Sequence, residues 1–397
     1  MAMGTGIITQ NMSAAAMAAN PSALSGRTIN CNIESGLVLE NAVIKRATFA
    51  NSKIWNSTIR NVTFENCTFS QTHFMTTTFE NVIFKGGSVS HRSSKNSYDE
   101  PSFEDVIFLD VVIDGVSLSE AYFQVRSRGT KLTLRNLTNI RNKYVTFYIG
   151  NSSLVMDNCK ASGELMAVLS GERTTVYVNN CEFRKYSGIG GNCRSIYINN
   201  SKFFNFSHIA GGDNTVIQNS LLTGQIGHAN IQQLYLVNNE HPQSDPKEPW
   251  LGRTVLRTHV DGKVFLDGRN YQNAYLTVVS GSVLIRDLNC VNLILGSPGK
   301  ELDPQTFDLC NVDIKGLQFL DLNLKSARWE NVRLEPPVTL DNARIASLQT
   351  YNSTIAQEFI SMGASGNNGI RVTESPHPFN FPQIVAPTPE SIGVRVE

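Results

Sequence analysis

Large apolar residues recur at every fifth position from Ala42 to Ser90, and a small or β-branched residue stands two places before each of them. A period of five matches neither the 3.6-residue period of a helix nor the two-residue period of an ordinary strand. It fits a square coil in which five residues form each side, four sides complete a turn and each large residue points inward. The large residues are Ile44, Phe49, Ile54, Ile59, Phe64, Phe69, Phe74, Phe79, Phe84 and Val89, and their small partners are Ala42, Ala47, Ser52, Ser57, Val62, Cys67, Thr72, Thr77, Val82 and Gly87.

This pattern is interrupted and later returns. After Val89 a serine-rich polar stretch runs to Pro101, and the period resumes at Phe103, one residue out of phase. A loop that leaves one rung and re-enters it explains the slip. The period recurs over residues 309–355, with a second one-residue slip at Pro336. Both stretches are therefore predicted to belong to one architecture.

Between Leu132 and Asn239 the five-residue period fades, and alternating apolar segments that end in asparagine take its place. Asparagine tolerates the left-handed backbone of a tight corner, and stacked asparagine side chains hydrogen-bond along the axis of a coil. These asparagines are therefore predicted to be structural corner residues of longer rungs. They recur every 19 to 22 residues, at Asn136, Asn158, Asn180, Asn200, Asn219 and Asn239.

Together these patterns predict an all-β fold, a right-handed parallel β-helix with quadrilateral coils at both ends and longer rungs in the middle. The β-helix is predicted to be a single domain over residues 25–357. Three polar excursions interrupt it, and they are predicted to be loops at 86–101, 240–254 and 296–305.

The two ends of the chain are expected to differ from the rungs. Residues 1–24 are predicted to be a leader or an N-terminal cap, with a short helix over 13–19 that Asn20-Pro21 would end. Residues 354–362 are predicted to form a short closing helix. Residues 358–397 as a whole are predicted to be a C-terminal cap and a proline-containing extended tail, lying on the coil or free in solvent.

The chain has 34 basic and 34 acidic residues in 397, and this balance argues against a general nucleic-acid surface. Locally the charges are segregated, with an acidic stretch over 99–123 and a basic one over 124–145. Acidic and basic residues that lie 21 positions apart are expected to meet on adjacent rungs and to fix the register. These pairs are Asp105 with Arg126, Asp110 with Lys131, Asp114 with Arg135, and Glu120 with Arg141.

The seven cysteines include no CxxC pair, so buried free thiols are expected in place of zinc ligands or a disulfide framework. No apolar run is long enough to span a bilayer, and the N-terminal stretch lacks the features of a secretory signal peptide. Asn-x-Ser/Thr sites are frequent, but without a signal peptide these asparagines are interpreted as turn and ladder residues. A bacterial origin fits best.

Parallel β-helices also form polysaccharide lyases and hydrolases, whose chemistry needs two or three carboxylates in a groove, or a carboxylate cluster that holds calcium beside an arginine. The candidates for such chemistry are Asp157, Asp213, Asp267, Asp287 and Arg286. They stand on different repeats and form no dense acidic cluster, so solvated turn or rung-edge charges are the competing interpretation. His208 and His228 fall one expected rung apart without an evident third metal ligand. The sequence assigns no catalytic residue, cofactor or metal.

The strict repeats resemble the bacterial pentapeptide-repeat family, whose unit is a small residue, a polar residue, Leu or Phe, and two further polar residues. The resemblance covers residues 26–123 and 307–355 and includes seven uninterrupted units from Ile54 to Phe84. It implies a β-helical scaffold with several possible uses. The loops and the longer middle rungs depart from the family pattern.

Some members of that family protect DNA gyrase by imitating duplex DNA, but residues 26–90 carry six basic and four acidic residues, which does not suit such imitation. Others are effectors that type III secretion injects into host cells, including the β-helical part of HECT-like ubiquitin ligases. Those ligases need a nucleophilic cysteine in a C-terminal helical domain, whereas the last cysteine here is Cys310, inside a repeat. The resemblance therefore implies a recognition part without the ligase.

The expected function is a non-enzymatic scaffold whose loops bind a protein partner, as a bacterial effector or accessory protein linked to virulence. It is expected in the bacterial cytoplasm or secreted into a host cell, with no nucleic-acid partner and no membrane span; the oligomeric state is left open. The alternative is a glycan-binding or polysaccharide-degrading, tailspike-like protein. The candidate partner-binding residues are His91, Arg92, Lys95, Tyr98, Trp250 and Arg253.

Overall fold

A computed structural model of the 397-residue chain gives the architecture. The structure describes residues 7–8, 14–30, 32–33, 36–90, 102–119, 121–125, 130–138, 140, 145–185, 187–210, 212–226, 230–240, 254–268, 270–296, 306–364 and 370–396. Strands take up 65% of the residues and helices 6%, and the named strands pair in parallel, so the predicted β-helical class is confirmed. No helix of the described residues has the length and apolarity needed to cross a membrane.

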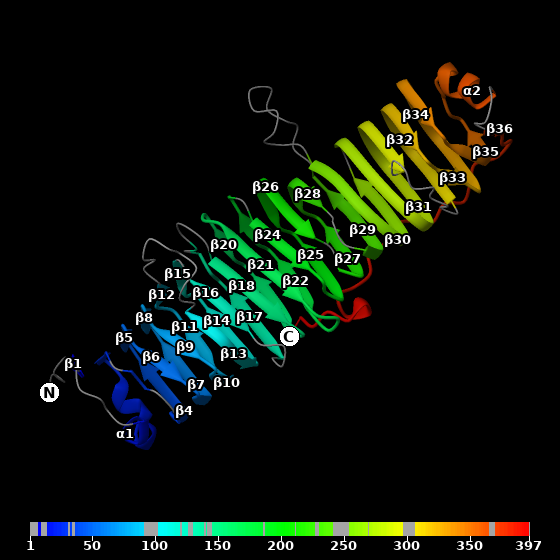
Figure 1. The fold of residues 1–397 in the computed structure, drawn as a ribbon. Helices are drawn as coiled ribbons and strands as arrows, with labels where there is room; N and C mark the ends of the chain where they lie inside the picture. The colour runs from blue at the N-terminus through cyan, green and yellow to red at the C-terminus, as the bar shows by residue number, and fades with distance from the viewer. Residues whose placement is uncertain are drawn as a thin grey trace. The chain divides into compact units, whose positions relative to one another are not determined.

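The chain divides into two compact units, residues 1–194 with 393–397, and residues 195–392. Figure 1 labels helices and strands of both units. The first unit contains the helix α1 (Ala14–Ala19) and the 3-10 helix η1 (Pro21–Leu24). Its first twelve strands are β1 (Ile7–Ile8), β2 (Thr28–Ile29), β3 (Asn32–Ile33), β4 (Val38–Lys45), β5 (Thr48–Ala50), β6 (Lys53–Trp55), β7 (Thr58–Glu65), β8 (Thr68–Ser70), β9 (His73–Met75), β10 (Thr78–Glu80), β11 (Ile83–Lys85) and β12 (Ser88–Ser90). Its other strands are β13 (Phe103–Leu109), β14 (Val111–Asp114), β15 (Ser117–Ser119), β16 (Tyr122–Val125), β17 (Lys131–Arg135), β18 (Val145–Gly150), β19 (Ser153–Asp157), β20 (Lys160–Ala161), β21 (Leu165–Ser170), β22 (Thr175–Asn179), β23 (Glu182–Phe183) and β24 (Ser187–Gly191).

The second unit contains longer strands that bend around the coil, together with two short helices. The strands are β25 (Ser195–Asn199), β26 (Lys202–Ala210), β27 (Asn214–Gln218), β28 (Leu221–Ile226), β29 (Asn230–Asn239), β30 (Thr254–Gly268), β31 (Asn270–Gly296), β32 (Thr306–Leu320), β33 (Asn323–Leu324), β34 (Ser326–Asp341), β35 (Arg344–Tyr351) and β36 (Ile370–Glu374). The helices are α2 (Gln357–Ala364) and the 3-10 helix η2 (Glu390–Ile392).

The first strict stretch is a square coil, as its period predicts. Four corners in a row have left-handed backbone, at Asn41, Arg46, Asn51 and Asn56, with φ between 45° and 54°. Residues on adjacent rungs pair at a distance of 20 positions, as Leu39 does with Ile59 and Phe49 does with Phe69. Five residues per side and four corners per turn therefore account for the register.

The large apolar residues of the period fill the interior of the coil. The rings of Phe49 and Phe69 stack on adjacent rungs with centroids 5.0 Å apart, and Phe103 stacks between Phe74 and Phe123 at 5.1 and 4.6 Å. Each of these side chains is 3% exposed or less. The six cysteines of the described residues are all buried thiols that form no disulfide, as expected.

The rungs keep their register across each of the three excursions. Phe79 pairs with Phe108, 29 positions later, although 20 positions suffice on the preceding rung. Leu236 likewise pairs with Leu266, and Ile285 with Leu309. The extra residues therefore lengthen single turns without shifting the phase of the core. The slip at Pro336 is of the same kind, since Lys315 pairs with Glu335 but Leu317 with Val338.

The corner asparagines form side-chain ladders along the axis. Asn158 donates to Asn136 at 2.7 Å, and Asn238 donates to Asn219 at 2.8 Å. One predicted position was wrong, because the left-handed corner lies at Asn238 and not at Asn239. Asn239 is instead buried, and its Nδ2 donates to the carbonyl oxygen of Ile217. The other predicted corners, at Asn136, Asn158, Asn180, Asn200 and Asn219, all have positive φ.

Both expected helices are present near the ends of the strand stacks, as α1 and α2. In α1, the side chain of Met17 is fully buried, and the helix contacts β4. In α2, Phe359 is fully buried, and its ring lies 5.3 Å from that of Trp329. Apolar side chains of short helices therefore cover rung edges that would otherwise be open to pairing.

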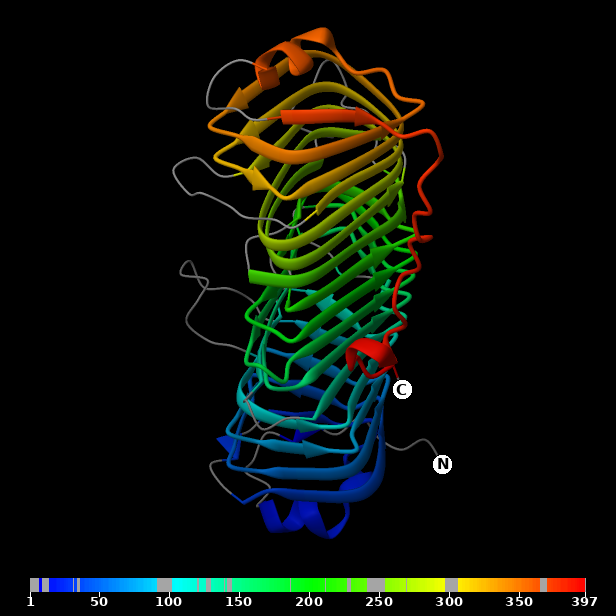
Figure 2. The same cartoon turned by 90° about the vertical axis from the view of Figure 1, so that its right-hand side faces the viewer.

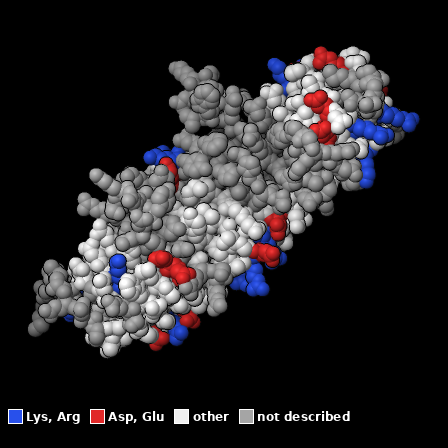
Figure 3. All heavy atoms as spheres, viewed as in Figure 1, with Lys and Arg blue, Asp and Glu red and all other residues white. Residues whose placement is uncertain are grey.

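Charged side chains pair between rungs on the outer faces. Asp114 and Arg135 are register partners, as their spacing predicts, but the Asp114 carboxylate accepts a hydrogen bond from Asn136 at 2.8 Å. Glu120, Arg126 and Arg141 lie outside the described residues. Arg60 bridges Glu40 and Glu80, on the rungs before and after it, at 3.1 and 2.7 Å. On the face drawn in Figure 3, basic and acidic side chains stand in small mixed groups. Such exposed pairs contribute about 0.2–1 kcal/mol each.

Candidate functional site

The six candidate partner-binding residues all lie outside the described residues. His91, Arg92, Lys95 and Tyr98 belong to 91–101, and Trp250 and Arg253 belong to 241–253. The structure describes only the strands on either side of these segments. Their role in binding stays a prediction.

In the second unit, two columns of outward-facing residues run across successive strands. Their side chains alternate with the buried residues Leu236, Leu266, Ile285 and Leu309, so they point away from the core. The first column is Tyr197, Val216, Tyr235, Phe265, Leu284, Asp308 and Arg328. The second column is Val237, Asp267, Arg286, Cys310 and Glu330.

Much of the first column is buried although it faces outward. Val216 is 1% exposed, and Tyr197 and Leu284 are each 6% exposed. An outward residue on a β-helix becomes inaccessible only when another segment covers it. The cover is the C-terminal segment after β36, which runs along the outside of these strands (Figure 2, in red). We call residues 375–392 the tail, and the two columns beneath it the tail seat.

The tail packs aromatic and aliphatic side chains onto the seat. Phe381 and Ile384 form one buried cluster with Leu284 and Cys310. Four half-buried residues surround that cluster, namely Tyr235, Val237, Phe265 and Phe379. The prediction left open whether the tail lies on the coil or in solvent, and the structure places it on the coil.

Three hydrogen bonds from side chains of the strands to backbone atoms of the tail fix its path. Oε2 of Glu330 accepts the N–H of Phe379 at 2.6 Å, and Nη1 of Arg286 donates to the carbonyl of Pro382 at 2.8 Å. Farther along, the hydroxyl of Ser195 donates to the carbonyl of Ile392 at 2.7 Å. The tail therefore runs back along the strands, from β34 towards β25.

Arg328 links the rungs to the aromatic part of the tail. Its guanidinium binds both carboxylate oxygens of Asp308, at 3.3 Å through Nε and 2.6 Å through Nη2. It also lies over the ring of Phe381, 4.9 Å from the centroid. Because the carboxylate holds the guanidinium in a fixed plane, the ring meets a positioned cation.

Three of the five candidates for carbohydrate chemistry meet at this seat. Asp267 and Arg286 are register partners on adjacent rungs, and Nε of Arg286 lies 3.9 Å from Oδ2 of Asp287. Burial raises the pKa of the Asp267 carboxyl above its ordinary value, and the nearby charge of Asp287 raises it further. Asp287 itself stands at a left-handed corner and accepts a hydrogen bond from Asn311.

The other two candidates are placed differently. Asp157 accepts the side-chain N–H of Asn179 at 3.0 Å, within a polar ladder between rungs. Asp213 accepts two backbone N–H groups through its carbonyl, from Gln232 and Gln233. Of the two histidines, His228 lies outside the described residues, and His208 falls within β26. No group of three or more metal-binding side chains occurs among the residues that the structure describes.

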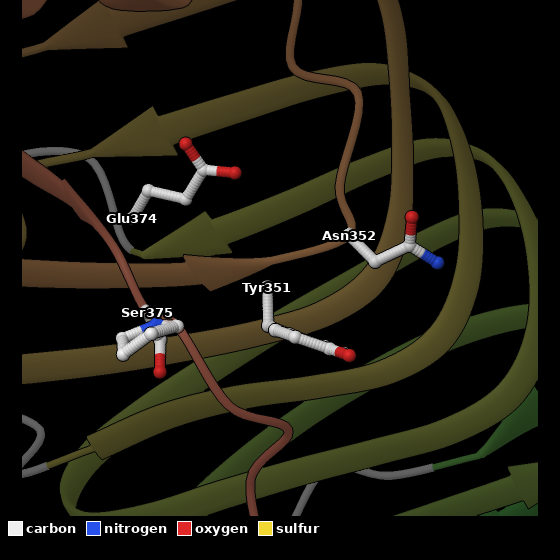
Figure 4. A pocket seen from close by; sticks show the side chains of 5 residues that line it. Tyr351, Asn352, Glu374 and Ser375 are labelled. Carbon is white, nitrogen blue, oxygen red and sulfur yellow. The ribbon is translucent and has the colours of Figure 1, made fainter.

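A shallow hollow lies where the tail leaves β36 (Figure 4). It measures about 510 Å³ and is lined by Tyr351, Asn352, Glu374, Ser375 and Pro376. The backbone N–H of Ser375 donates to the carbonyl of Thr350, so the first tail residue is held against β35. The hollow offers one carboxylate, one phenol, an amide and a hydroxyl, a set that suits neutral polar ligands better than anions.

With this geometry established, comparison of the chain with family models, with curated proteins and with solved structures finds no match. The fold and the tail seat therefore stand on the residues themselves.

The tail seat is the feature that sequence reasoning missed. A signal for it exists, because the segments VFL at 264–266 and VLI at 283–285 are apolar at every position. A strand that is apolar on both faces is buried on both faces. These segments therefore predict that another part of the chain covers them on the outside of the coil.

Proposed function

We propose that the protein is a non-enzymatic β-helical scaffold that binds a protein partner through the segments inserted between its rungs. The observation that supports this most directly is the unbroken register across each insertion, as between Phe79 and Phe108. Because the rungs on either side of an insertion keep their register, the core does not constrain the sequence of the insertion. The insertions are therefore free to be selected for recognition.

The proposed setting is a bacterial effector or accessory protein of the pentapeptide-repeat type. The five-residue step, with left-handed corners at residues such as Asn51 and Asn56, supports the family resemblance. The helix of 14–19, with its buried Met17, supports a capping role for at least part of the N-terminal region. Type III secretion and action inside a host cell belong to the same proposal.

The test is affinity capture of partners with three forms of the full chain. One form is unchanged, one has residues 242–252 replaced by a Gly-Ser linker of equal length, and one has the same replacement at 92–100. The proposal expects a partner that the unchanged chain captures and at least one replaced chain loses. Equal capture by all three forms contradicts it. Matching urea unfolding curves would show that the replaced chains are folded.

The second candidate function is polysaccharide cleavage, and the raised pKa of Asp267 is the observation that favours it. A carboxyl whose pKa is raised suits a general acid better than an ordinary aspartate does, and Asp287 would supply the second carboxylate. The tail covers this region, however, and Arg286 binds the tail carbonyl there. Release of oligosaccharides from a polysaccharide panel, lost in both Asp267→Asn and Asp287→Asn, would establish this function instead.

A further inference from the structure

We propose that the tail seat is a peptide-binding site for an extended protein segment, and that the chain's own tail is its resident ligand. The external ligand would carry the features that the seat contacts in the tail. These are two aromatic residues separated by one residue, followed by proline and, two residues later, an aliphatic residue. In the tail they are Phe379, Phe381, Pro382 and Ile384.

The shape of the seat favours an extended segment over a folded domain. The tail has no regular secondary structure from 375 to 388, yet alternate side chains such as Phe379 and Phe381 reach the seat. Phe381 and Ile384 are each 9% exposed, whereas Pro382 and Gln383 between them are exposed. A ligand that follows the same path needs its apolar side chains at these positions.

The polar contacts of the seat indicate at which positions the sequence of the ligand is free to vary. Glu330 accepts a backbone N–H and Arg286 donates to a backbone carbonyl, so neither contact depends on the identity of the ligand residue. Selectivity comes from the ring beside Arg328 and from the apolar surface of Leu284 and Phe265. Backbone contacts combined with side-chain pockets are the usual basis for recognising extended peptides.

The tail leaves part of the seat unsatisfied. The Nε group of Arg286 is buried and has no hydrogen-bond partner among the described residues, and its nearest carboxylate oxygen, on Asp287, lies 3.9 Å away. A buried donor without a partner costs about 1–3 kcal/mol. A ligand that places an oxygen at this N–H would therefore bind better than the tail does.

Tethering determines how the two ligands compete. A segment attached through a short flexible link has an effective concentration of about 1 mM, which an external peptide must overcome. Detachment of the tail should therefore reveal the site. The inference goes beyond the inserted segments of the proposed function, because the residues that define the seat all belong to strands.

The experiment uses the full chain with a protease recognition sequence inserted between His377 and Pro378. The chain folds first and is then cleaved, and the released fragment is removed by dilution and filtration. A fluorescein-labelled peptide of residues 378–392 is then titrated in, and binding is measured by fluorescence anisotropy. A scrambled peptide of the same composition serves as the control for non-specific adsorption.

We expect saturable binding to the cleaved chain, and binding at least tenfold weaker to the uncleaved chain. The Phe381→Ala peptide should bind at least tenfold more weakly than the native peptide, whereas the Gln383→Ala peptide should match it because Gln383 is exposed. An unrelated peptide with the same aromatic, proline and aliphatic spacing should bind, and the scrambled peptide should not.

Several outcomes would overturn the inference. Binding that ignores Phe381→Ala, or failure of the unrelated spaced peptide, would rule out recognition of this chemistry. Unfolding of the chain when the fragment leaves, seen as loss of its circular dichroism, would show that the tail is a permanent part of the fold. None of these results bears on the inserted segments, so the proposed function would be judged separately.

Discussion

The backbone N–H of Phe379 donates a 2.6 Å hydrogen bond to the carboxylate of Glu330, a residue 49 positions earlier in the chain. This bond holds the start of the tail on β34, so its loss should loosen the tail more than the core. We expect Glu330→Ala to speed amide hydrogen exchange over 378–384, in line with a local loss of about 1–2 kcal/mol. Glu330→Gln keeps an acceptor oxygen and should show a much smaller effect. Equal hydrogen-exchange rates in the two variants would show that this hydrogen bond does not hold the tail.

Phe103 tests the stacked core of the first unit. Its ring lies between those of Phe74 and Phe123, and it is 1% exposed. Phe103→Ala should lower the free energy of unfolding by about 3–5 kcal/mol, because the surrounding rings cannot fill the cavity. Phe103→Leu should cost about 1–2 kcal/mol. Urea unfolding followed by circular dichroism measures both losses, and Val385→Ala, at a position 75% exposed, is the neutral control.

The corner at Asn331 separates backbone strain from ladder hydrogen bonds. Asn331 has φ 52°, donates to Asn311 at 2.8 Å and accepts from Asn352 at 2.7 Å. Asn331→Gly loses only the side-chain bonds and should cost about 1 kcal/mol. Asn331→Ala also places a Cβ residue without a compensating side-chain bond in left-handed backbone, and should lower the free energy of unfolding by about 1–2 kcal/mol more. Thermal and urea unfolding compare the two, and equal losses would contradict the strain argument.

The carboxyl of Asp267 should make stability depend on pH. Burial, and then the charge of Asp287, raise its folded-state pKa above the unfolded value, so the folded state holds this proton more tightly. The resulting stabilisation is fully present below about pH 3.9, the unfolded value, and is lost as the pH rises through the folded pKa. Asp267→Asn should therefore gain stability relative to the unchanged chain as the pH is raised from 3 to 7.

Urea midpoints at each pH measure this difference between the two chains. Asp287→Asn removes the charge that is the second cause of the raised Asp267 pKa. The pH range over which the stability difference develops should therefore move to lower pH. A difference between Asp267→Asn and the unchanged chain that stays constant from pH 3 to 7 would mean that Asp267 has an ordinary pKa.

The inward half of the fold could be predicted from the sequence. From Ile44 onwards, the apolar residue at every fifth position identifies the core, because each of these side chains faces the axis of the coil and packs against other inward-facing side chains. The corners follow from asparagine, since few other residues accept left-handed backbone at low cost. The error at Asn239 shows the limit of this reasoning. Where two asparagines are adjacent, composition cannot tell which one takes the corner and which one is buried.

The outward half was much harder to predict. Phe265 and Leu284 are apolar enough to require a cover, but nothing local indicates that the cover comes from Phe381 and Ile384, about 100 residues later. Asp267 and Arg286 appeared to be separate charges because their pairing depends on the register of the long middle rungs, where the strict five-residue period is absent. Local sequence patterns predict the period of the rungs, whereas the segment that covers an outer face is determined by tertiary contacts.

The hydrogen bond from Ser195 to Ile392 spans 197 positions and joins the first and last residues of the second unit. A ribosome that adds about 5–20 residues per second needs about 10–40 s to make the intervening chain. Strands can stack in that time, because each rung needs only the one before it. The outer columns stay bare meanwhile, since the segment that covers them has not been made. During synthesis, the nascent protein therefore exposes an aromatic surface that the finished protein hides, and a chaperone could recognise it there.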